Sequence, residues 1–309
     1  MRLIFMGNPQ FAVPALEKLL SSRHEVAAVV TSPDRPKGRG KKPASPAVAE
    51  KAREKGLTLI QQENLSEQSF LAKITALAVT IFVVVAFRIL PAELFSIPPR
   101  GAINLHASLL PKYRGAAPIQ WAIINGERET GLTTFSIQKK VDTGGIILQE
   151  KVPIGPMETA DDLSARMSVL GADLILQTLD LIESGDYEII PQDNSQASKA
   201  PKIKPSDGHV DWSLPAEKIV NLIRGLSSNP GAYTHFDGKK LKLYRARLVE
   251  AENSRKPGEI ITANDREGLV IKTGKDAVLI DEIQMEGKKR LPCCDYMRGC
   301  PIKEGHFLT

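Results

Sequence analysis

The chain has 309 residues, of which 42% are hydrophobic and 25% are charged. A chain of this length can bury one large core or two smaller ones, and it lies near the upper limit for a single domain. We therefore expect two domains. The formal net charge of +5 favours a polyanionic partner without requiring one.

The cysteines and the apolar runs exclude several classes of protein. Cys293, Cys294 and Cys300 all lie in the last segment without C-x-x-C spacing, which argues against a metal site or a disulfide framework. The first apolar run begins at Leu3, which leaves no room for a secretory leader. The longest apolar run, residues 76–87, falls far short of the roughly 20 residues that span a bilayer. A reduced, cytoplasmic protein without membrane spans is expected.

The first half of the chain alternates apolar runs with helical patterns. In chain order we predict a strand at 2–7, a helix at 9–20, a strand at 25–31, a helix at 45–55, strands at 79–87, 102–108, 132–138 and 146–152, and a long helix at 160–183. The 79–87 run is apolar and β-branched throughout, as expected of a central strand covered on both faces. Strands that alternate with helices predict an α/β fold with a doubly wound, mostly parallel sheet.

The amino-acid composition of the chain changes after the long helix. Residues 191–207 are polar and rich in Pro, Ser and Lys, which is typical of an irregular linker. A short helix is expected at 215–226, followed by brief strands at 232–236, 240–249, 258–263, 268–273 and 277–284. Short strands with frequent turns indicate a small β-barrel. We predict a catalytic domain at 1–190, a linker at 191–207 and a C-terminal β-barrel at 208–309.

Polar side chains interrupt the apolar stretch "INLHASLLPKYRGAAP" at residues 103–118. In a strand, Asn104 and His106 project side by side from one face. They lie at the end of a strand, where open α/β sheets place their ligand crevice. Pro111 and Gly115 in the following loop fix its shape and let a ligand approach the backbone. This arrangement favours a catalytic role, although a core histidine beside a turn-capping asparagine is the structural alternative.

A second stretch, "VDTGG", places Asp142 in a glycine turn between two predicted strands. Alone, this sequence is typical of a hairpin turn. Together with Asn104 and His106, and without a nucleophilic Ser or Cys, it indicates proton transfer and oxyanion stabilisation. Asp142 could hold His106 cationic. Ser108 is the nearest hydroxyl, but G-x-S-x-G is absent, so a hydrolase nucleophile is not expected.

These stretches resemble the folate-dependent formyltransferases, and in particular those that act on methionyl-tRNA. The resemblance rests on "INLHASLLPKYRGAAPIQWAI" and "VDTGG" and covers essentially the whole chain, since "GNPQFAVPAL", "TSPDRPKGRGKK", "DGHVDWS" and "RGCPIKEG" occur in the expected order. It implies a Rossmann-like formyltransferase domain followed by a β-barrel that is similar to oligonucleotide-binding folds and binds tRNA.

The resemblance also implies the reaction and its residues. Asn104, His106 and Asp142 match the catalytic trio of the family. The formyl donor would be 10-formyltetrahydrofolate, and the acceptor the α-amine of methionine on initiator tRNA, for translation initiation. Asn104 and protonated His106 would donate hydrogen bonds to the oxyanion, while Asp142 orients His106. No metal is implied, because the formyl group arrives activated. The expected folate contacts are Ser108, Leu109, Leu110, Pro111, Phe87 and Leu90.

A basic loop at residues 34–42, "DRPKGRGKK", bears on the choice of acceptor. The resemblance implies that it approaches the acceptor end of tRNA, where cations bind phosphates. Its five cations are Arg35, Lys37, Arg39, Lys41 and Lys42. A solvated charged loop is the structural alternative. The alternative function is transfer of the formyl group to a small amine, such as glycinamide ribonucleotide or a nucleotide amino sugar. A non-enzymatic RNA-binding protein would explain the charge but would give Asn104, His106 and Asp142 no role. We expect a monomer.

Two positions depart from the family pattern beside the expected site. Arg88 stands where a turn containing glycine is common, next to the expected folate contact Phe87. Gly145 stands where an acidic residue is common, which leaves Asp142 as the only carboxylate of that turn.

Overall fold

The computed structural model describes residues 1–37, 42–252, 254–299 and 302–309. The chain forms two compact units that interleave in sequence. The first unit consists of residues 1–115, 130–152 and 164–199, and the second of residues 116–129, 153–163 and 200–309. No helix in the described part of the chain is both long enough and apolar enough to cross a membrane.

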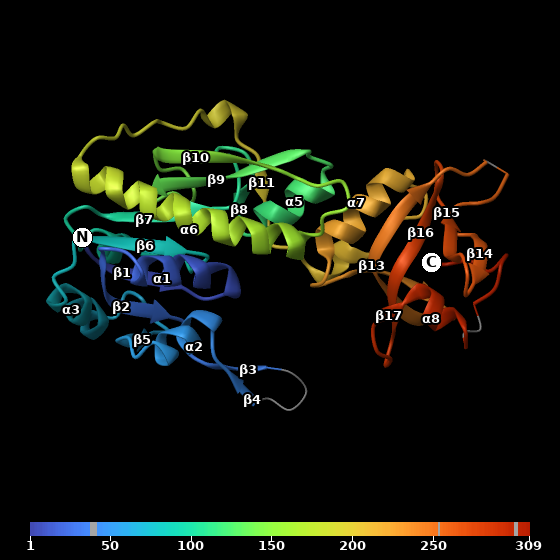
Figure 1. The fold of residues 1–309 in the computed structure, drawn as a ribbon, viewed down its shortest axis with the longest axis horizontal. Helices are drawn as coiled ribbons and strands as arrows, with labels where there is room; N and C mark the ends of the chain where they lie inside the picture. Colours follow the sequence, from blue (N-terminus) through green and yellow to red (C-terminus); the bar gives the residue numbers. More distant parts are fainter. Residues whose placement is uncertain (38–41, 253, 300–301) are drawn as a thin grey trace. The chain divides into compact units, whose positions relative to one another are not determined.

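A seven-stranded sheet forms the centre of the first unit (Figure 1). Its strand order is β10-β9-β7-β6-β1-β2-β5. The strands are β10 (Ile146–Pro153), β9 (Glu129–Ser136), β7 (Ala102–His106), β6 (Ile81–Val85), β1 (Arg2–Gly7), β2 (Glu25–Thr31) and β5 (Leu59–Gln61). The pairs from β5 to β7 are parallel, and β9 runs antiparallel to β7. The expected α/β fold with a mostly parallel sheet is confirmed.

Helices cover both faces of this sheet. They are α1 (Val13–Leu20) after the 3₁₀ turn η1 (Gln10–Ala12), α2 (Ala47–Glu54), α3 (Gln68–Ala76), α4 (Ala92–Phe95) and α6 (Ala160–Ser184). One face packs Ile4, Met6, Phe82, Val84 and Ala102 with Phe70 and Ile74 of α3. On the other face, a methyl group added to Gly171 of α6 would meet Leu105 at 2.5 Å. Because side chains alternate along a strand, Asn104 and His106 belong to the face opposite α6.

Helix α6 has clear start and stop signals. At its start the Thr159 hydroxyl accepts from the Asp162 N–H at 3.2 Å, and the Asp162 carboxylate accepts from the Thr159 N–H at 3.2 Å. The Thr159 hydroxyl also donates to the Asp162 carboxylate at 2.7 Å, and this hydrogen bond, together with the one from the Thr159 N–H, lowers the pKa of Asp162. At its end, Gly185 has a φ of 79° and donates to the Leu181 carbonyl at 3.0 Å. Glycine adopts this conformation without steric cost, so the helix ends there.

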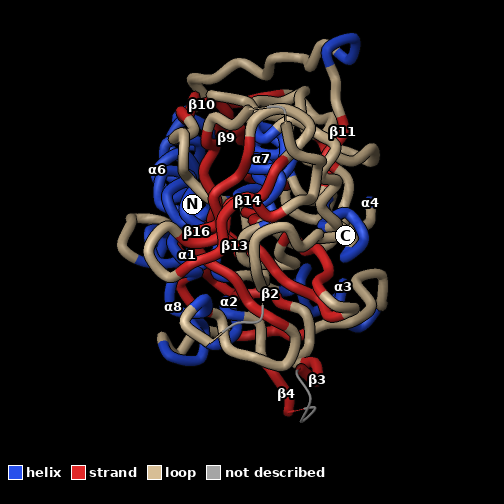
Figure 2. The backbone as a smooth tube through the Cα atoms, turned by 90° about the vertical axis from the view of Figure 1, so that its right-hand side faces the viewer, coloured by secondary structure: helices blue, strands red, loops and turns tan. Residues whose placement is uncertain are grey.

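The basic loop begins and ends as a small hairpin. Strands β3 (Arg35–Lys37) and β4 (Lys42–Ala44) pair antiparallel, with Lys37 opposite Lys42, and both are labelled in Figure 2. Asp34, just before β3, accepts a hydrogen bond from Gln61 of β5 at 2.8 Å, which anchors the base of the hairpin. The predicted tRNA contacts Arg39 and Lys41 lie outside the described residues.

The second unit contains an antiparallel sheet in the order β12-β13-β16-β15-β14, with β17 beside β16. The strands are β12 (Ala232–Phe236), β13 (Lys239–Val249), β14 (Ile260–Asn264), β15 (Gly268–Lys272), β16 (Ala277–Met285) and β17 (Leu291–Pro292). The last residues join the two edges. Thr309 exchanges hydrogen bonds with His235 of β12, and Leu308 donates to Gly258 just before β14. These bonds close the sheet into the small barrel that the turn spacing predicts.

Helices α5 (Pro118–Ile124), α7 (Ala216–Leu226) and α8 (Cys293–Met297) complete the second unit, with the 3₁₀ turn η3 (Pro205–Gly208). The core of the barrel contains Trp212, Ile219 and Ile223 together with residues of the strands. Inside this unit α5 packs against α7, where a methyl group on Gly225 would meet Ile124 at 2.6 Å. The remaining short elements are β8 (Arg114–Gly115), β11 (Lys199–Ala200) and η2 (Asn194–Gln196).

Candidate active site

Strand β7 carries Asn104 and His106 to the end of the parallel part of the sheet. In the register, Asn104 lies between Val84 of β6 and Phe135 of β9. The strand ends at His106, which is only 6% exposed. This is the strand end where open α/β sheets form their ligand crevice, so the fold places both side chains where the sequence predicts them.

The ring of His106 has a defined hydrogen-bond partner. Its Nε2 lies 2.9 Å from the backbone oxygen of Tyr113, and a carbonyl can only accept. Nε2 therefore carries the proton of the neutral ring. Nδ1 lies 3.9 Å from Oδ2 of Asp142, so a second proton on Nδ1 would face a carboxylate.

Asp142 is held by the backbone and lies beside the ring of His106. Its Oδ2 accepts from the Gly115 N–H at 2.9 Å, and its side chain is 12% exposed. Its φ of 53° lies in the left-handed region, which is strained for a non-glycine residue. A methyl group on Gly144 would lie 1.6 Å from the Ser136 oxygen. The turn therefore requires glycine at 144, and Asp142 is aimed by a tightly constrained backbone.

The amide of Asn104 is available for a ligand. Its residue is half-buried, and among the described residues no hydrogen bond engages the side chain. Two N–H donors thus remain on the same sheet face as His106. Together, the Asn104 amide and the Nδ1 proton of a cationic His106 could stabilise negative charge that develops on an oxygen bound at the end of β7.

The segment 108–111 is fixed by hydrogen bonds from β9 and β10. The Ser108 hydroxyl donates to the Lys112 carbonyl at 2.6 Å, so it is engaged in its own loop and is not a free nucleophile. Thr133 accepts from the Leu110 N–H at 3.2 Å, and Gln149 donates to the Leu110 carbonyl at 2.8 Å. These bonds fix the course of the main chain at the expected folate contacts Ser108 to Pro111.

The other expected folate contacts follow β6. Phe87 is half-buried against the core cluster beside α3, to which buried Leu90 belongs. Arg88 donates to the backbone oxygens of Gln62 and Glu63, and burial lowers its pKa. The left-handed conformation that favours glycine occurs at Ala86, with a φ of 47°. Arg88 therefore clamps this loop to the neighbouring one, a role that its sequence position did not reveal.

The predicted tRNA contacts are only partly described. Arg35 makes an exposed ion pair with Glu63 at 2.8 Å, and exposed pairs are worth little. Lys37 and Lys42 are opposite one another in the hairpin backbone.

Several residues that shape the site were not predicted from the sequence. Tyr113 acts through its carbonyl, so its side-chain identity carries no signal, and Gly115, which was expected only to shape the loop, donates its N–H to Asp142. Gln192 lies in the predicted linker, yet it donates to the Asp142 carbonyl at 3.0 Å.

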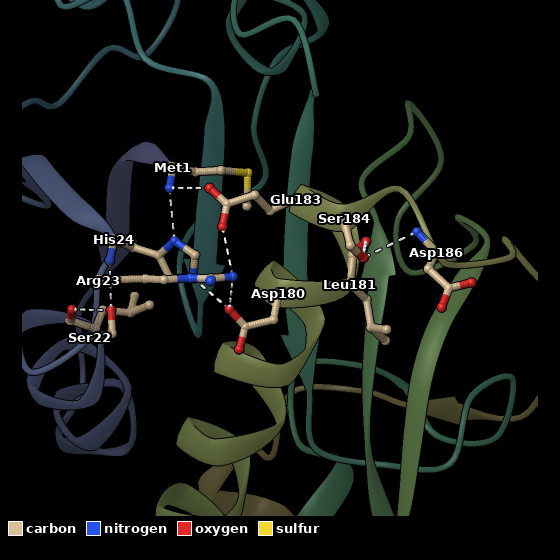
Figure 3. Close-up of polar contacts among 10 residues, drawn as sticks. Met1, Ser22, Arg23, His24, Asp180, Leu181, Glu183, Ser184 and Asp186 are labelled. Atoms are coloured by element: carbon tan, nitrogen blue, oxygen red, sulfur yellow. Dashed lines mark hydrogen bonds and ion pairs between the residues drawn. The ribbon is translucent and has the colours of Figure 1, made fainter.

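One other cluster of titratable groups has an arrangement that could suit a metal. In the described part of the chain, the only group of three or more potential metal ligands whose ligand atoms all lie within 4.8 Å of one another is His24, Asp180 and Glu183. Figure 3 shows Arg23 between the two carboxylates, 2.8 Å from each, and the Met1 amine 2.9 Å from both His24 and Glu183. The acidic groups are therefore already paired with cations, and the cluster ties the end of α6 to the start of β2.

Comparison with known proteins identifies the family of the chain. The family described as "Formyl transferase" matches residues 1–179, and "Formyl transferase, C-terminal domain" matches residues 202–301. The methionyl-tRNA formyltransferase of Moorella thermoacetica is 45% identical over 309 residues, covering 100% of this chain and 99% of the relative. The methionyl-tRNA formyltransferase of Geobacter sulfurreducens is 46% identical over 309 residues, covering 100% and 96%.

Solved structures share the fold at lower identity. The N-formyltransferase from Helicobacter canadensis, in complex with folinic acid and dTDP-3-aminofucose, has a TM-score of 0.68 and 22% identity, covering 94% of this chain and 99% of its own. HypX from Aquifex aeolicus, in complex with tetrahydrofolic acid, has a TM-score of 0.66 and 21% identity, and this chain covers 50% of its length. With both family domains matched in order and full-length relatives at this identity, the chain belongs to the formyl transferase family.

Proposed function

We propose that this chain transfers a formyl group from 10-formyltetrahydrofolate to the α-amine of methionine on initiator tRNA, and that Asn104, His106 and Asp142 carry the reaction. The observation that carries the proposal is His106 at the end of β7, bonded through Nε2 to the Tyr113 carbonyl and facing Asp142 through Nδ1. The His106 ring can hold a proton on Nδ1, and the side-chain amide of Asn104 lies on the same face of the sheet.

The residues around this atom fit a folate. Half-buried Phe87 offers a ring for the flat heterocycle, and the constrained main chain of 108–111 lies after the same strand as His106. Two proteins with this fold were solved with tetrahydrofolic acid or folinic acid, which supports the same cosubstrate class. When bound, the folate supplies a formyl group that is already activated for transfer, so the proposal requires no metal.

The side chains divide the remaining work. The Asn104 amide and the Nδ1 proton of His106 would bind the formyl oxygen as negative charge develops there, and one lost donor of this kind typically costs about 10²-fold in rate. Asp142 keeps that proton on Nδ1 and orients the ring. Its carboxylate can also accept a hydrogen bond from a water that collects the proton of the attacking amine.

The choice of acceptor rests on two observations. Full-length relatives at 45% identity are named methionyl-tRNA formyltransferases, whereas a solved sugar N-formyltransferase and a glycinamide ribonucleotide transformylase are 22% and 19% identical. The basic loop at residues 34–42 offers cations to a macromolecular anion, and a small-amine acceptor would leave this loop without a role. The proposal includes a role in translation initiation, a cytoplasmic location and a monomeric chain.

Transfer of labelled formyl to a panel of acceptors tests this choice. The panel holds methionyl initiator tRNA, the same tRNA uncharged, free methionine, glycinamide ribonucleotide and a nucleotide amino sugar. We expect transfer to the charged tRNA alone. Efficient transfer to a small amine would keep the chemistry and refute the proposed acceptor.

A further inference from the structure

Residues 190–198, here called the strap, connect the two loops of the candidate site. At one end, Ile190 exchanges backbone hydrogen bonds of 2.8 and 2.9 Å with Ile146, next to the Asp142 turn. At the other end, Ser198 accepts from the Tyr113 N–H through its hydroxyl and from the Arg114 N–H through its carbonyl, both at 2.9 Å. The strap therefore crosses from one loop to the other within the first unit.

Gln192 lies between these ends and uses its whole side-chain amide. Its Nε2 donates to the Asp142 carbonyl at 3.0 Å and to the Gly144 carbonyl at 2.7 Å. Its Oε1 accepts from Nε and Nη2 of Arg114 at 3.0 and 2.5 Å. The orientation of the amide is determined by its partners, since a flipped amide would point N–H groups at the guanidinium and its oxygen at two carbonyls.

These bonds act on the residue with the strained backbone. Asp142 has a φ of 53°, and such a conformation persists only where neighbours hold it. Its carboxylate lies 3.9 Å from Nδ1 of His106, so a small rotation of the turn would change this separation. Arg114 belongs to the loop that also provides the Tyr113 carbonyl to His106. Gln192 thus connects the turn that carries Asp142 with the loop that carries Tyr113, and both of these segments contact the imidazole of His106.

We propose that Gln192, held by Arg114, is a positioning residue that sets the Asp142 carboxylate against His106. The proposal rests on the proposed function, in which Asp142 and His106 act in formyl transfer. It assigns the predicted linker a role in the active site. The side-chain hydrogen bonds of Gln192 go to Asp142, Gly144 and Arg114, so its main effect should be transmitted through the Asp142 turn.

Replacement of Gln192 is the direct test. Gln192→Ala should lower kcat by about 10- to 100-fold, as a misplaced reacting group does, while KM for methionyl-tRNA and for the folate stays within about twofold. Gln196→Ala is the matched control, because Gln196 is an exposed glutamine of the same strap that bonds to Asp193 instead. Gln192→Glu keeps an acceptor for Arg114 but offers no donor to the two carbonyls, so it should behave like Gln192→Ala.

A double-variant cycle separates positioning from general support. On the Asp142→Asn background, Gln192→Ala should cost less than about twofold, because residues that act as a unit are not additive. The positioning role would be overturned if Gln192→Ala lowered kcat by the same factor in wild type and in Asp142→Asn. It would also be overturned if Gln192→Ala lowered the unfolding temperature and left kcat unchanged. If Gln192→Ala fails to fold, Gln192→Glu is measured in the same cycle. Full activity of Asp142→Asn itself would reject the proposed trio and this inference together, whereas loss in Asp142→Asn without loss in Gln192→Ala rejects this inference only.

Discussion

At the scale of single residues, the proposed mechanism depends on one proton between His106 and Asp142. The Nε2 bond to Tyr113 leaves Nδ1 as the only ring atom that can gain a proton, and Asp142 is the carboxylate nearest to it. The main-chain donor Gly115 fixes that carboxylate. The charge of Asp142 and the position of its oxygen are therefore separable by substitution.

Asp142→Asn separates them. The asparagine oxygen can still accept from the Gly115 N–H, so the turn should remain folded, but the negative charge that faces Nδ1 of His106 is removed. We expect kcat to fall by roughly 10²- to 10⁴-fold, the usual range for proton-transfer groups. Steady-state transfer assays measure the effect, with the thermal unfolding midpoint as the control for folding. Near-normal kcat would remove Asp142 from the mechanism.

The sequence revealed the side chains of this site but not its backbone partners. Asn104 and His106 could be found because their types and alternation are unusual at the end of a strand, whereas Asp142 stood out only in combination with them and through the resemblance. Tyr113 contributes only a carbonyl, and any residue offers one. Gln192 lies in a polar segment whose composition is that of a connector, and only its tertiary contacts reveal its bonds.

At the scale of elements, strongly patterned segments were predictable, whereas some of the shortest ones were not. The β-branched run around β6 and the apolar spacing of α6 give strong signals over many residues. Helix α5 has seven residues and strand β5 only three, too few for a period to stand out. Whether a short segment becomes regular depends on what packs against it, and that information is spread over distant parts of the chain.

The contact between α6 and the start of β2 should make stability depend on pH. His24 is buried, and burial, followed by the nearby terminal ammonium, lowers its pKa below the ordinary 6.5. The unfolded chain then binds more protons than the folded one as the pH falls through about 6.5, so the free energy of unfolding should decrease there. Denaturant titrations between pH 7.5 and 5, with ranges chosen around the ordinary pKa, measure this slope.

The variant His24→Gln isolates the contribution of His24 to the pH dependence of the free energy of unfolding. His24→Gln should flatten the slope, whereas His306→Gln, at an exposed position, should leave it unchanged. An equal slope in wild type and His24→Gln would show that other groups control the dependence.

The basic loop at residues 34–42 should contribute to tRNA binding through its positive charge. Replacing Arg39 and Lys41 by alanine should weaken the binding of methionyl-tRNA and reduce its salt dependence, by roughly 0.7 to 0.9 in the log–log slope for each phosphate that is no longer neutralised. Titrations of tRNA at several salt concentrations measure both quantities, and kcat at saturating tRNA is the control. If affinity and slope both stayed the same, the hairpin would be only a solvated surface.

At the scale of the whole molecule, the two units interleave while the predicted domains follow one another. The predicted boundary at 191–207 stays a prediction. Within the second unit, however, α5 packs against α7, and Arg224 of α7 donates to the Gly155 carbonyl at 3.1 Å. Helix α5 and the segment around Gly155, which precede the predicted linker, are thus packed or hydrogen-bonded by α7, which follows it.

A fragment of residues 1–207 tests this dependence. It keeps α5 but lacks α7, so apolar surface around Ile124 would face water. We expect the fragment to unfold at a lower temperature than the full chain in calorimetry, or to aggregate. An unfolding temperature equal to that of the first transition of the full chain would support an independent domain ending at the predicted linker.

The most direct measurement of the central claim is single-turnover transfer of labelled formyl from 10-formyltetrahydrofolate to methionyl initiator tRNA by wild type and His106→Ala. We predict rapid transfer by wild type and a rate lowered by about 10²-fold or more in the variant, with tRNA affinity unchanged, because only the donor to the formyl oxygen is removed. Equal rates for the two proteins would contradict the proposed mechanism, since the reaction would then take place without the residue on which the whole site is built.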